Sequence, residues 1–320
     1  MPKNRKSERP TARWWQRPRK PTGGGVDRNS LIGYSRFTPY ALSGPAILMV
    51  GGLLAFPVIY SIWKSLFYAE FIGGKEEFVG FRNYADLLTE GDFLWSLSRT
   101  MIFVGGSLIL GVSLAIIFAF ALNRAGKRLR FLRGLTIVPY LVSGVAAAVM
   151  FRLIFNEEFG QVNRVLEVFG IDGPSWFSSP TLAMVAAIIA QVWTDLPLAI
   201  LLILGGLQTV EPSLLDAAEV DGATGWKRAT KISIPLVSPQ IVLATVWFSY
   251  ATLTSLGVVL ALTRGGPLNA TRTLPVLLYN MAFQELRYNE ALALVIIILL
   301  INAFLTIGYI ATARRVDLGN

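Results

Sequence analysis

The chain has 320 residues, of which 53% are hydrophobic and only 15% are charged, with a mean hydropathy of +0.54. Soluble domains carry about 25% charged residues, so this composition excludes an ordinary soluble fold and indicates a chain embedded in lipid. No Cys or His is present, which excludes disulfides, Cys-His or Ser-His catalysis and zinc–thiolate sites. No phosphate-loop motif is present, so we expect no cofactor on this chain and any ATP on another one.

The chain begins with a basic segment over residues 1–38, rich in Pro and Gly, that we expect to be disordered. Six apolar stretches follow, each with about the 20 residues that a helix needs to cross a bilayer. They run over Pro39–Trp63, Thr100–Leu122, Gly134–Phe155, Pro180–Leu207, Ile241–Thr263 and Asn289–Thr312. The sequence therefore predicts an all-α polytopic membrane protein with six transmembrane helices over residues 39–312 and a tail over 313–320.

The distribution of charge predicts the orientation of these spans. With six spans, the side that holds both termini carries 20 Lys and Arg residues against 9 on the opposite side. Basic residues concentrate in cytoplasmic segments, so we expect both termini in the cytoplasm, with the basic loop near Arg128 at the lipid surface. The same distribution accounts for the net charge of +9 without a nucleic-acid partner.

Two features inside the spans predict contacts. Small residues at every fourth position of the second span, and again in the fourth, indicate close helix packing. They are Ser107, Gly111, Ala115 and Ala119, then the pairs Ala183/Ala187 and Ala186/Ala190. Proline at positions 57, 139 and 197 is expected to bend the spans that contain it.

Asp195 is the one carboxylate well inside a span, where an unpaired charge costs at least ~2.5–3.5 kcal/mol. We expect it to face a watery cavity, a partner chain or a donor such as Thr194, although anchoring of a kink at Pro197 explains it equally well. Trp193 offers a flat apolar face of the kind on which sugars stack. The candidate substrate pathway is Gln191, Trp193, Asp195, Tyr250 and Thr254.

The loop over residues 211–239 predicts a helix, a sharp turn and a second helix. Ser213 is expected to cap the first helix with Asp216 three residues later, and Gly222 to end it. The second helix is expected to end at Pro235. A short helix of this kind suits docking into a cleft on a soluble partner.

This loop resembles the E-A-A-x-x-x-G motif of bacterial ATP-binding-cassette (ABC) importer permeases, in the longer form of the carbohydrate-uptake class. The matching residues are Asp216 in place of the first Glu, Ala217, Ala218, Asp221, Gly222, Ala223, Trp226, Ile232, Pro235 and Pro239. With Glu219 inside the motif, the resemblance assigns ATPase coupling to the stretch from Asp216 to Pro235. The shorter side chain of Asp216 puts in doubt a salt bridge that the family's Glu would make.

Three further stretches resemble this family and extend the likeness from about Pro39 onward. They are Phe78–Tyr84, Phe155–Asn163 and Leu262–Pro267 with Thr271 and Leu274. The last is typical of the half that resembles the larger maltose and the first glycerol-phosphate permease subunits. Ser255–Leu260 is small and apolar where many sugar permeases carry Asp or Asn near Gly257, and Asp195 stands where other residues are commoner, so the usual sugar contacts are in doubt.

The resemblance implies a type I ABC importer transmembrane domain in the bacterial inner membrane, with no catalysis of its own. It implies four kinds of partner: a second permease subunit, two ATPase subunits that carry ATP and Mg²⁺, an extracytoplasmic solute-binding protein, and membrane lipids. The expected solute is a sugar or related polyol, and a glycerophosphate ester is the alternative. Three other classes of protein fit less well. A secondary transporter would need paired ionisable groups or inverted repeats, and a membrane enzyme would need a clustered catalytic pair. A structural subunit would not need a coupling loop.

Overall fold

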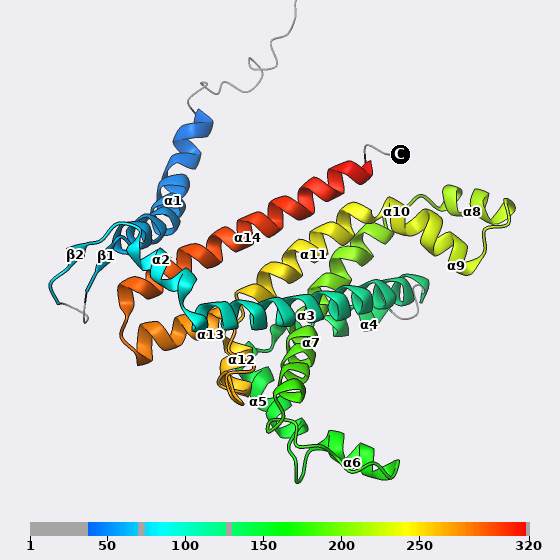
Figure 1. The fold of residues 1–320 in the computed structure, drawn as a ribbon. Coiled ribbons are helices and arrows are strands. Elements are labelled where there is room, and N and C mark those ends of the chain that lie inside the picture. The colour runs from blue at the N-terminus through cyan, green and yellow to red at the C-terminus, as the bar shows by residue number, and fades with distance from the viewer. Residues whose placement is uncertain (1–37, 70–73, 126–129, 318–320) are drawn as a thin grey trace, which may run out of the picture. The chain divides into compact units, whose positions relative to one another are not determined.

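The computed structural model describes residues 38–69, 74–125 and 130–317, so the predicted basic tail lies outside the described residues apart from Thr38. The chain divides into two compact units at Pro57/Val58. The described part of the first unit is the beginning of helix α1 (Thr38–Lys64). The second unit holds the remaining elements (Figure 1).

The second unit is built almost entirely of helices. The long ones are α3 (Gly91–Arg124), α7 (Pro180–Leu207), α11 (Ser238–Leu253) and α14 (Tyr288–Asp317). The short ones are α2 (Arg82–Thr89), α4 (Arg130–Thr136), α5 (Gly144–Ile154), α6 (Gln161–Val168), α8 (Pro212–Val220), α9 (Gly225–Arg228), α10 (Ile234–Leu236), α12 (Gly257–Leu262) and α13 (Leu274–Tyr279). A 3₁₀ turn η2 (Pro139–Leu141) and the π-helical turns η3 (Ala229–Ser233) and η4 (Asn280–Gln284) complete them.

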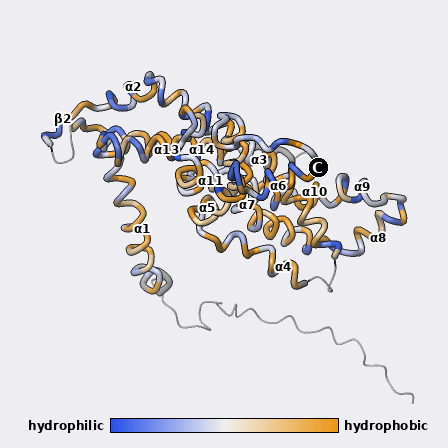
Figure 2. Tube along the Cα trace, turned by 90° about the horizontal axis from the view of Figure 1, so that it is seen from below, coloured by the Kyte–Doolittle hydropathy of each residue, from blue (hydrophilic) through white to orange (hydrophobic). Residues whose placement is uncertain are grey.

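Four helices of the described chain are long and apolar enough to cross a membrane, and the count rises to six if each of two bent helix pairs forms one span. The all-α polytopic prediction is thereby confirmed. Figure 2 shows hydrophobic residues predominating along these helices and hydrophilic residues gathering near β2 and α2. The helix α3 has 34 residues and is about 51 Å long, so it exceeds the ~30 Å hydrocarbon core.

Two predicted spans differ from single helices. The stretch Gly134–Phe155 bends by 94° between Leu141 and Gly144, after the turn η2 that Pro139 begins, so α4 and η2 form one arm and α5 the other. The stretch Ile241–Thr263 breaks at residues 254–256, and a new helix α12 begins at Gly257. In contrast, Pro197 lies within a continuous α7. The number of consecutive apolar residues predicts the length of a span. The position of a helix break depends instead on which neighbouring groups bond the backbone N–H and C=O groups that the break leaves free.

The small-residue stripe of α3 is buried along its whole length, which confirms the predicted close packing. A Cβ atom added to Gly111 would lie 2.3 Å from the Phe248 ring of α11, so only glycine lets these helices approach. On α7, Ala183, Ala186, Ala187 and Ala190 are fully buried. The helices α3, α7 and α11 thus form the centre of the second unit.

The sequence did not predict the one small sheet among the described residues. Strands β1 (Phe67–Tyr68) and β2 (Glu77–Phe78) pair antiparallel, with Phe67 opposite Phe78. The Phe67 and Phe78 rings meet edge to face at 5.4 Å. This pairing follows α1 directly and leads into α2.

Candidate coupling loop and membrane site

The loop between α7 and α11 is a compact helical hairpin. Its first helix, α8, begins at Pro212 with Glu211 as the N-cap, so the predicted Ser213 cap with Asp216 was wrong. Proline is favoured at the first helical position because its φ is already helical and its missing N–H has no partner there. Figure 1 shows α8 and α9 at the end of α7 opposite to α6.

Gly222 ends α8 as predicted. Its φ is +78°, its N–H donates to the Glu219 carbonyl at 3.0 Å, and the Ala223 N–H donates to the Ala218 carbonyl at 2.9 Å. This pair of bonds is the Schellman arrangement, which requires a left-handed residue at the turn. The sharp reversal therefore depends on the backbone of Gly222.

The second helix does not end at Pro235 as predicted. Residues 225–236 run through α9, η3 and α10, and the 72° bend to α11 follows at Val237. The wider π turn directly before Pro235 accommodates the ring that would clash in a regular α-helix.

The surface of this hairpin exposes apolar side chains. Trp226 is 81% exposed and Val220 is 88% exposed, while Ala218 is buried between the two helices. Arg228 of α9 donates to Glu219 of α8 at 3.2 Å and joins the helices. Of the other predicted coupling residues, Asp216, Ala217, Asp221 and Pro235 are exposed and Ala223 is half-buried. An exposed Trp on a rigid turn is the kind of anchor that protein interfaces use.

The second candidate site lies inside the membrane region and centres on Asp195. The Gln191 amide donates to the Asp195 carboxylate at 2.5 Å, and the Ser255 hydroxyl donates to the Gln191 carbonyl at 2.6 Å. Asp195 and Gln191 are buried. Asp195 therefore does face a donor, but the donor is Gln191 and not the predicted Thr194, whose hydroxyl bonds the Ala190 carbonyl of its own helix.

This hydrogen-bonded chain, Asp195–Gln191–Ser255, reaches from α7 to the break between α11 and α12. The second break lies close to it, because Gly144 at the start of α5 packs against Val258, and Gly257 packs against Val145. Non-helical backbone at membrane depth is tolerated where it is buried in protein or lines a water-filled cavity. Two helix breaks therefore lie beside one buried carboxylate within the spans.

An aromatic row lies on α11 and η2. The Tyr140 and Trp247 rings are 6.5 Å apart, and the Trp247 and Tyr250 rings are 6.3 Å apart. Tyr250 is half exposed, whereas the indole N–H of Trp247 is enclosed and has no hydrogen-bond partner in the described structure. Flat aromatic faces of this kind can stack on the apolar face of a sugar ring.

The structure brings some predicted pathway residues together and separates others. Gln191 and Asp195 meet, and Tyr250 joins the aromatic row, but Thr254 bonds the Tyr250 carbonyl of its own helix. Trp193 meets Phe151 edge to face at 5.6 Å and is partly buried. Tyr140, Trp247 and Ser255 were missed, although the i, i+3 spacing of Trp247 and Tyr250 was a usable signal.

We call the side of the membrane opposite to α8 and α9 the distal side. The loops on this side are fixed by hydrogen bonds from the other stretches that resemble the family. In the Phe155–Asn163 stretch, Asn163 is buried, donates to the Glu157 carbonyl at 3.1 Å and accepts from the Trp176 indole at 2.7 Å. In the Leu262–Leu274 stretch, the Thr263 and Thr271 hydroxyls lie 2.7 Å apart. Both motifs therefore act on the distal loops as structural clamps.

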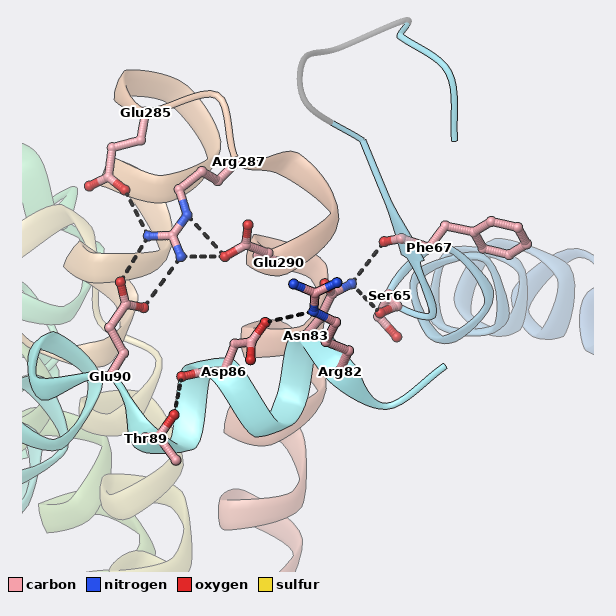
Figure 3. Close-up of polar contacts among 10 residues, drawn as sticks. All are labelled: Ser65, Phe67, Arg82, Asn83, Asp86, Thr89, Glu90, Glu285, Arg287 and Glu290. Atoms are coloured by element: carbon pink, nitrogen blue, oxygen red, sulfur yellow. Dashed lines mark hydrogen bonds and ion pairs between the residues drawn. The ribbon is translucent and has the colours of Figure 1, made fainter. Parts of the chain in front are cut away.

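The Phe78–Tyr84 stretch makes a third clamp, seen in Figure 3. The Asn83 amide donates to the Ser65 and Phe67 carbonyls, each at 2.8 Å, and so fixes the segment that follows α1. Near it, Arg287 before α14 binds Glu90 at 3.2 and 3.3 Å, Glu290 at 2.9 Å and Glu285 at 3.3 Å. Burial opposes the charge of Arg287, but the bonds to Glu290 and Glu90 outweigh it and raise the pKa of the guanidinium.

We expect Arg287→Gln to lower the free energy of unfolding by about 1–2 kcal/mol, because three carboxylates lose their shared cation. The matched control is Arg82→Gln on α2, whose pair with Asp86 at 3.5 Å is well exposed and should change stability by less than about 0.5 kcal/mol. Thermal unfolding of the purified protein measures both. Equal effects of the two variants would contradict a special role for Arg287.

Comparisons with known proteins agree on the family. Residues 109–318 match the family of binding-protein-dependent transport system inner membrane components. The trehalose/maltose transport system permease protein MalF of Thermococcus litoralis is 31% identical over 75% of this chain and 82% of its own length. The sulfoquinovosyl glycerol permease protein SmoG and the sn-glycerol-3-phosphate permease protein UgpA, both of Agrobacterium fabrum, are each 30% identical, over 88% and 87% of this chain and 92% and 94% of their own lengths.

The fold has solved counterparts. A bacterial ABC transporter involved in the import of the acidic polysaccharide alginate superposes with a TM-score of 0.75 at 21% identity, covering 91% of this chain and 97% of that chain. The same kind of transporter in complex with an alginate pentasaccharide-bound periplasmic protein gives a TM-score of 0.73 at 20% identity, with 91% and 96% covered. The chain therefore belongs to the family of binding-protein-dependent transport system inner membrane components, the multi-pass, non-catalytic permease subunits of ABC importers.

Proposed function

We propose that this chain forms one half of the translocation pathway for a sugar or related polyol, with a second permease subunit forming the other half. The observation that carries the proposal is the buried Asp195–Gln191–Ser255 chain beside two broken helices. Carboxylate, amide and hydroxyl groups suit the hydroxyls of a polyol, and the row Tyr140, Trp247 and Tyr250 suits its apolar faces. Relatives named for neutral sugars and for glycerol phosphate support the class of solute without choosing between them.

The hairpin of α8 and α9 is the proposed contact with the ATPase subunits. Its supports are the Schellman turn at Gly222 and the exposed Trp226 and Val220. ATP binding would draw the hairpins of the two permease halves together and open the pathway toward the distal side, as alternating access requires. The solute-binding protein would deliver the solute to that distal side.

Uptake into proteoliposomes tests this function. We expect uptake to require ATP and Mg²⁺ at the α8–α9 side and the solute-binding protein at the distal side, and to be blocked by vanadate but not by uncouplers. A secondary transporter would give the opposite pattern, because it depends on an ion gradient. Uptake that persists without ATP would therefore overturn the proposal.

Single cysteines test the proposed cytoplasmic position of the termini, because the natural chain has none. Val168 at the end of α6 is 83% exposed and Val220 at the end of α8 is 88% exposed. In intact spheroplasts, a membrane-impermeant maleimide should label Val168→Cys at once and Val220→Cys only after permeabilisation. Equal labelling of both before permeabilisation would contradict the six-span arrangement.

A further inference from the structure

Arg99 on α3 differs from Arg272 and Arg287, two other partly or fully buried arginines near the distal loops. Arg272 pairs with Asp92, and Arg287 pairs with three carboxylates. Within the described part of the chain, no carboxylate lies within 4 Å of the Arg99 guanidinium, and its enclosed Nε atom has no hydrogen-bond partner. A half-buried cation without a counter-charge is costly, so it indicates a partner that the chain alone does not supply.

The guanidinium of Arg99 is held in place. Its central carbon lies 3.9 Å from the centre of the Trp95 ring, one turn earlier on α3. The indole N–H of Trp95 donates to the Asn269 carbonyl at 3.0 Å, which fixes the ring against the distal loop. When one face of a guanidinium stacks on a fixed ring, the N–H groups along its edge can still donate to a planar, bidentate acceptor.

The position of the pair suits a passing solute. The next residue, Thr100, is buried and accepts from the Leu274 N–H at 2.8 Å, so Arg99 lies where α3 enters the protein core. It lies toward the distal end of α3, whereas the small residues Ser107 to Ala119 lie toward the other end. A solute that arrives from the distal side would meet Arg99 early in its passage.

We propose that Arg99, stacked on Trp95, binds an oxyanion, and that the imported sugar or polyol carries it as a phosphate, sulfonate or carboxylate group. This inference rests on the proposed import function and narrows its solute class. Arg99 would take the charged group, while Asp195 and the aromatic row would take the hydroxyls and the apolar faces. A phospholipid headgroup offers the same oxyanion chemistry, so the experiment must separate the two sources.

Arginine labelling with phenylglyoxal, followed by mass spectrometry of the intact purified importer, reads Arg99 directly and does not depend on transport. In lipid-free detergent at constant ionic strength, sn-glycerol 3-phosphate should slow the labelling of Arg99 by about tenfold, which corresponds to about 1.4 kcal/mol. Glycerol and maltose should leave the rate unchanged. Arg164 on α6, which is exposed and has no ion-pair partner in the described structure, is the internal control in the same digest.

Two variants test the role of the ring. Trp95→Leu should abolish the protection by sn-glycerol 3-phosphate, while Trp95→Phe, which keeps an aromatic face, should retain most of it. Slow labelling of Arg99 in phospholipid nanodiscs without added ester, together with no protection by the ester in detergent, would assign the oxyanion to a headgroup and overturn the solute assignment. A labelling rate of Arg99 that is the same in both media, with and without the phosphate ester, would overturn the oxyanion site itself.

The proposed import function and the proposed oxyanion site are tested by different measurements. Vanadate-sensitive, ATP-dependent uptake without protection of Arg99 would uphold the function and reject the oxyanion site. Protection of Arg99 in a complex whose uptake needs no ATP would reject the function instead.

Discussion

Gly222→Pro is expected to abolish ATP-driven uptake and the recovery of the ATPase subunits, while the chain stays in the membrane. Proline fixes φ near −65°, whereas this position has φ of +78°, and it removes the N–H that donates to Glu219. No atom lies within 4 Å of a Cβ placed at Gly222, so contact of a new Cβ atom with its surroundings is not the cause. The measurement is co-purification of the ATPase subunits through a tag on this chain, with uptake alongside it.

The chain offers a matched control in Gly170 at the end of α6. Its φ is +74°, it also has open space, and it makes the same pair of bonds, from its own N–H to Glu167 and from the next N–H to Leu166. Gly170→Pro therefore breaks the same motif on the distal side and should leave the ATPase subunits bound. Gly222→Asn should keep most of the uptake activity, because Asn tolerates the left-handed region. Gly222→Ala should have an activity between those of the Asn and Pro variants, because placing Ala in the left-handed region costs ~1–2 kcal/mol of conformational free energy. Normal recovery of the ATPase subunits with Gly222→Pro would count against the coupling role, and so would an equal loss of these subunits with Gly222→Pro and Gly170→Pro.

Asp195→Asn is the second change with a large expected effect. Asparagine keeps the shape of the side chain but removes its charge, so the hydrogen bonds that a carboxylate offers to solute hydroxyls become weaker. Hydrogen bonds to charged groups contribute about 1.5–3 kcal/mol, which corresponds to a fall in uptake of at least about tenfold. We expect assembly to be normal, because the Asn carbonyl can still accept from Gln191, which lies 2.5 Å from Asp195 in the native chain.

The neighbouring residue supplies the control. Thr194→Ala removes a hydroxyl that bonds the Ala190 carbonyl of its own helix, so uptake should change little. Asp195→Ala should lower uptake further and reduce the yield of complex, since Gln191 loses its acceptor. If Asp195→Asn transports normally and only Asp195→Ala fails, Asp195 anchors the helix and does not contact the solute. Normal uptake and normal yield with both variants would remove it from the pathway altogether.

The sequence by itself determined the membrane class, four of the six spans and the turn at Gly222. These features depend on composition and on local rules that hold in any context. Twenty apolar residues cross a bilayer, a stripe such as Ser107 to Ala119 lets a helix approach, and the Gly222 turn needs a residue that accepts positive φ. The expected partners came from the family resemblance, because rules of local structure do not say which other chains a protein binds.

Only the tertiary structure decided how the interior is arranged. The breaks at residues 142–143 and 254–256 depend on neighbours far along the chain, as the contacts of Gly144 with Val258 and of Gly257 with Val145 illustrate. The bond from Gln191 to Asp195 joins residues four apart on one helix, a spacing that helical periodicity allows. The support of Gln191 by Ser255, 64 residues away, has no such local signal and came only from the tertiary structure. The lack of an acidic partner for Arg99 among the described residues is likewise a property of three-dimensional packing, because a charge is paired or unpaired only with respect to the groups that surround it in space.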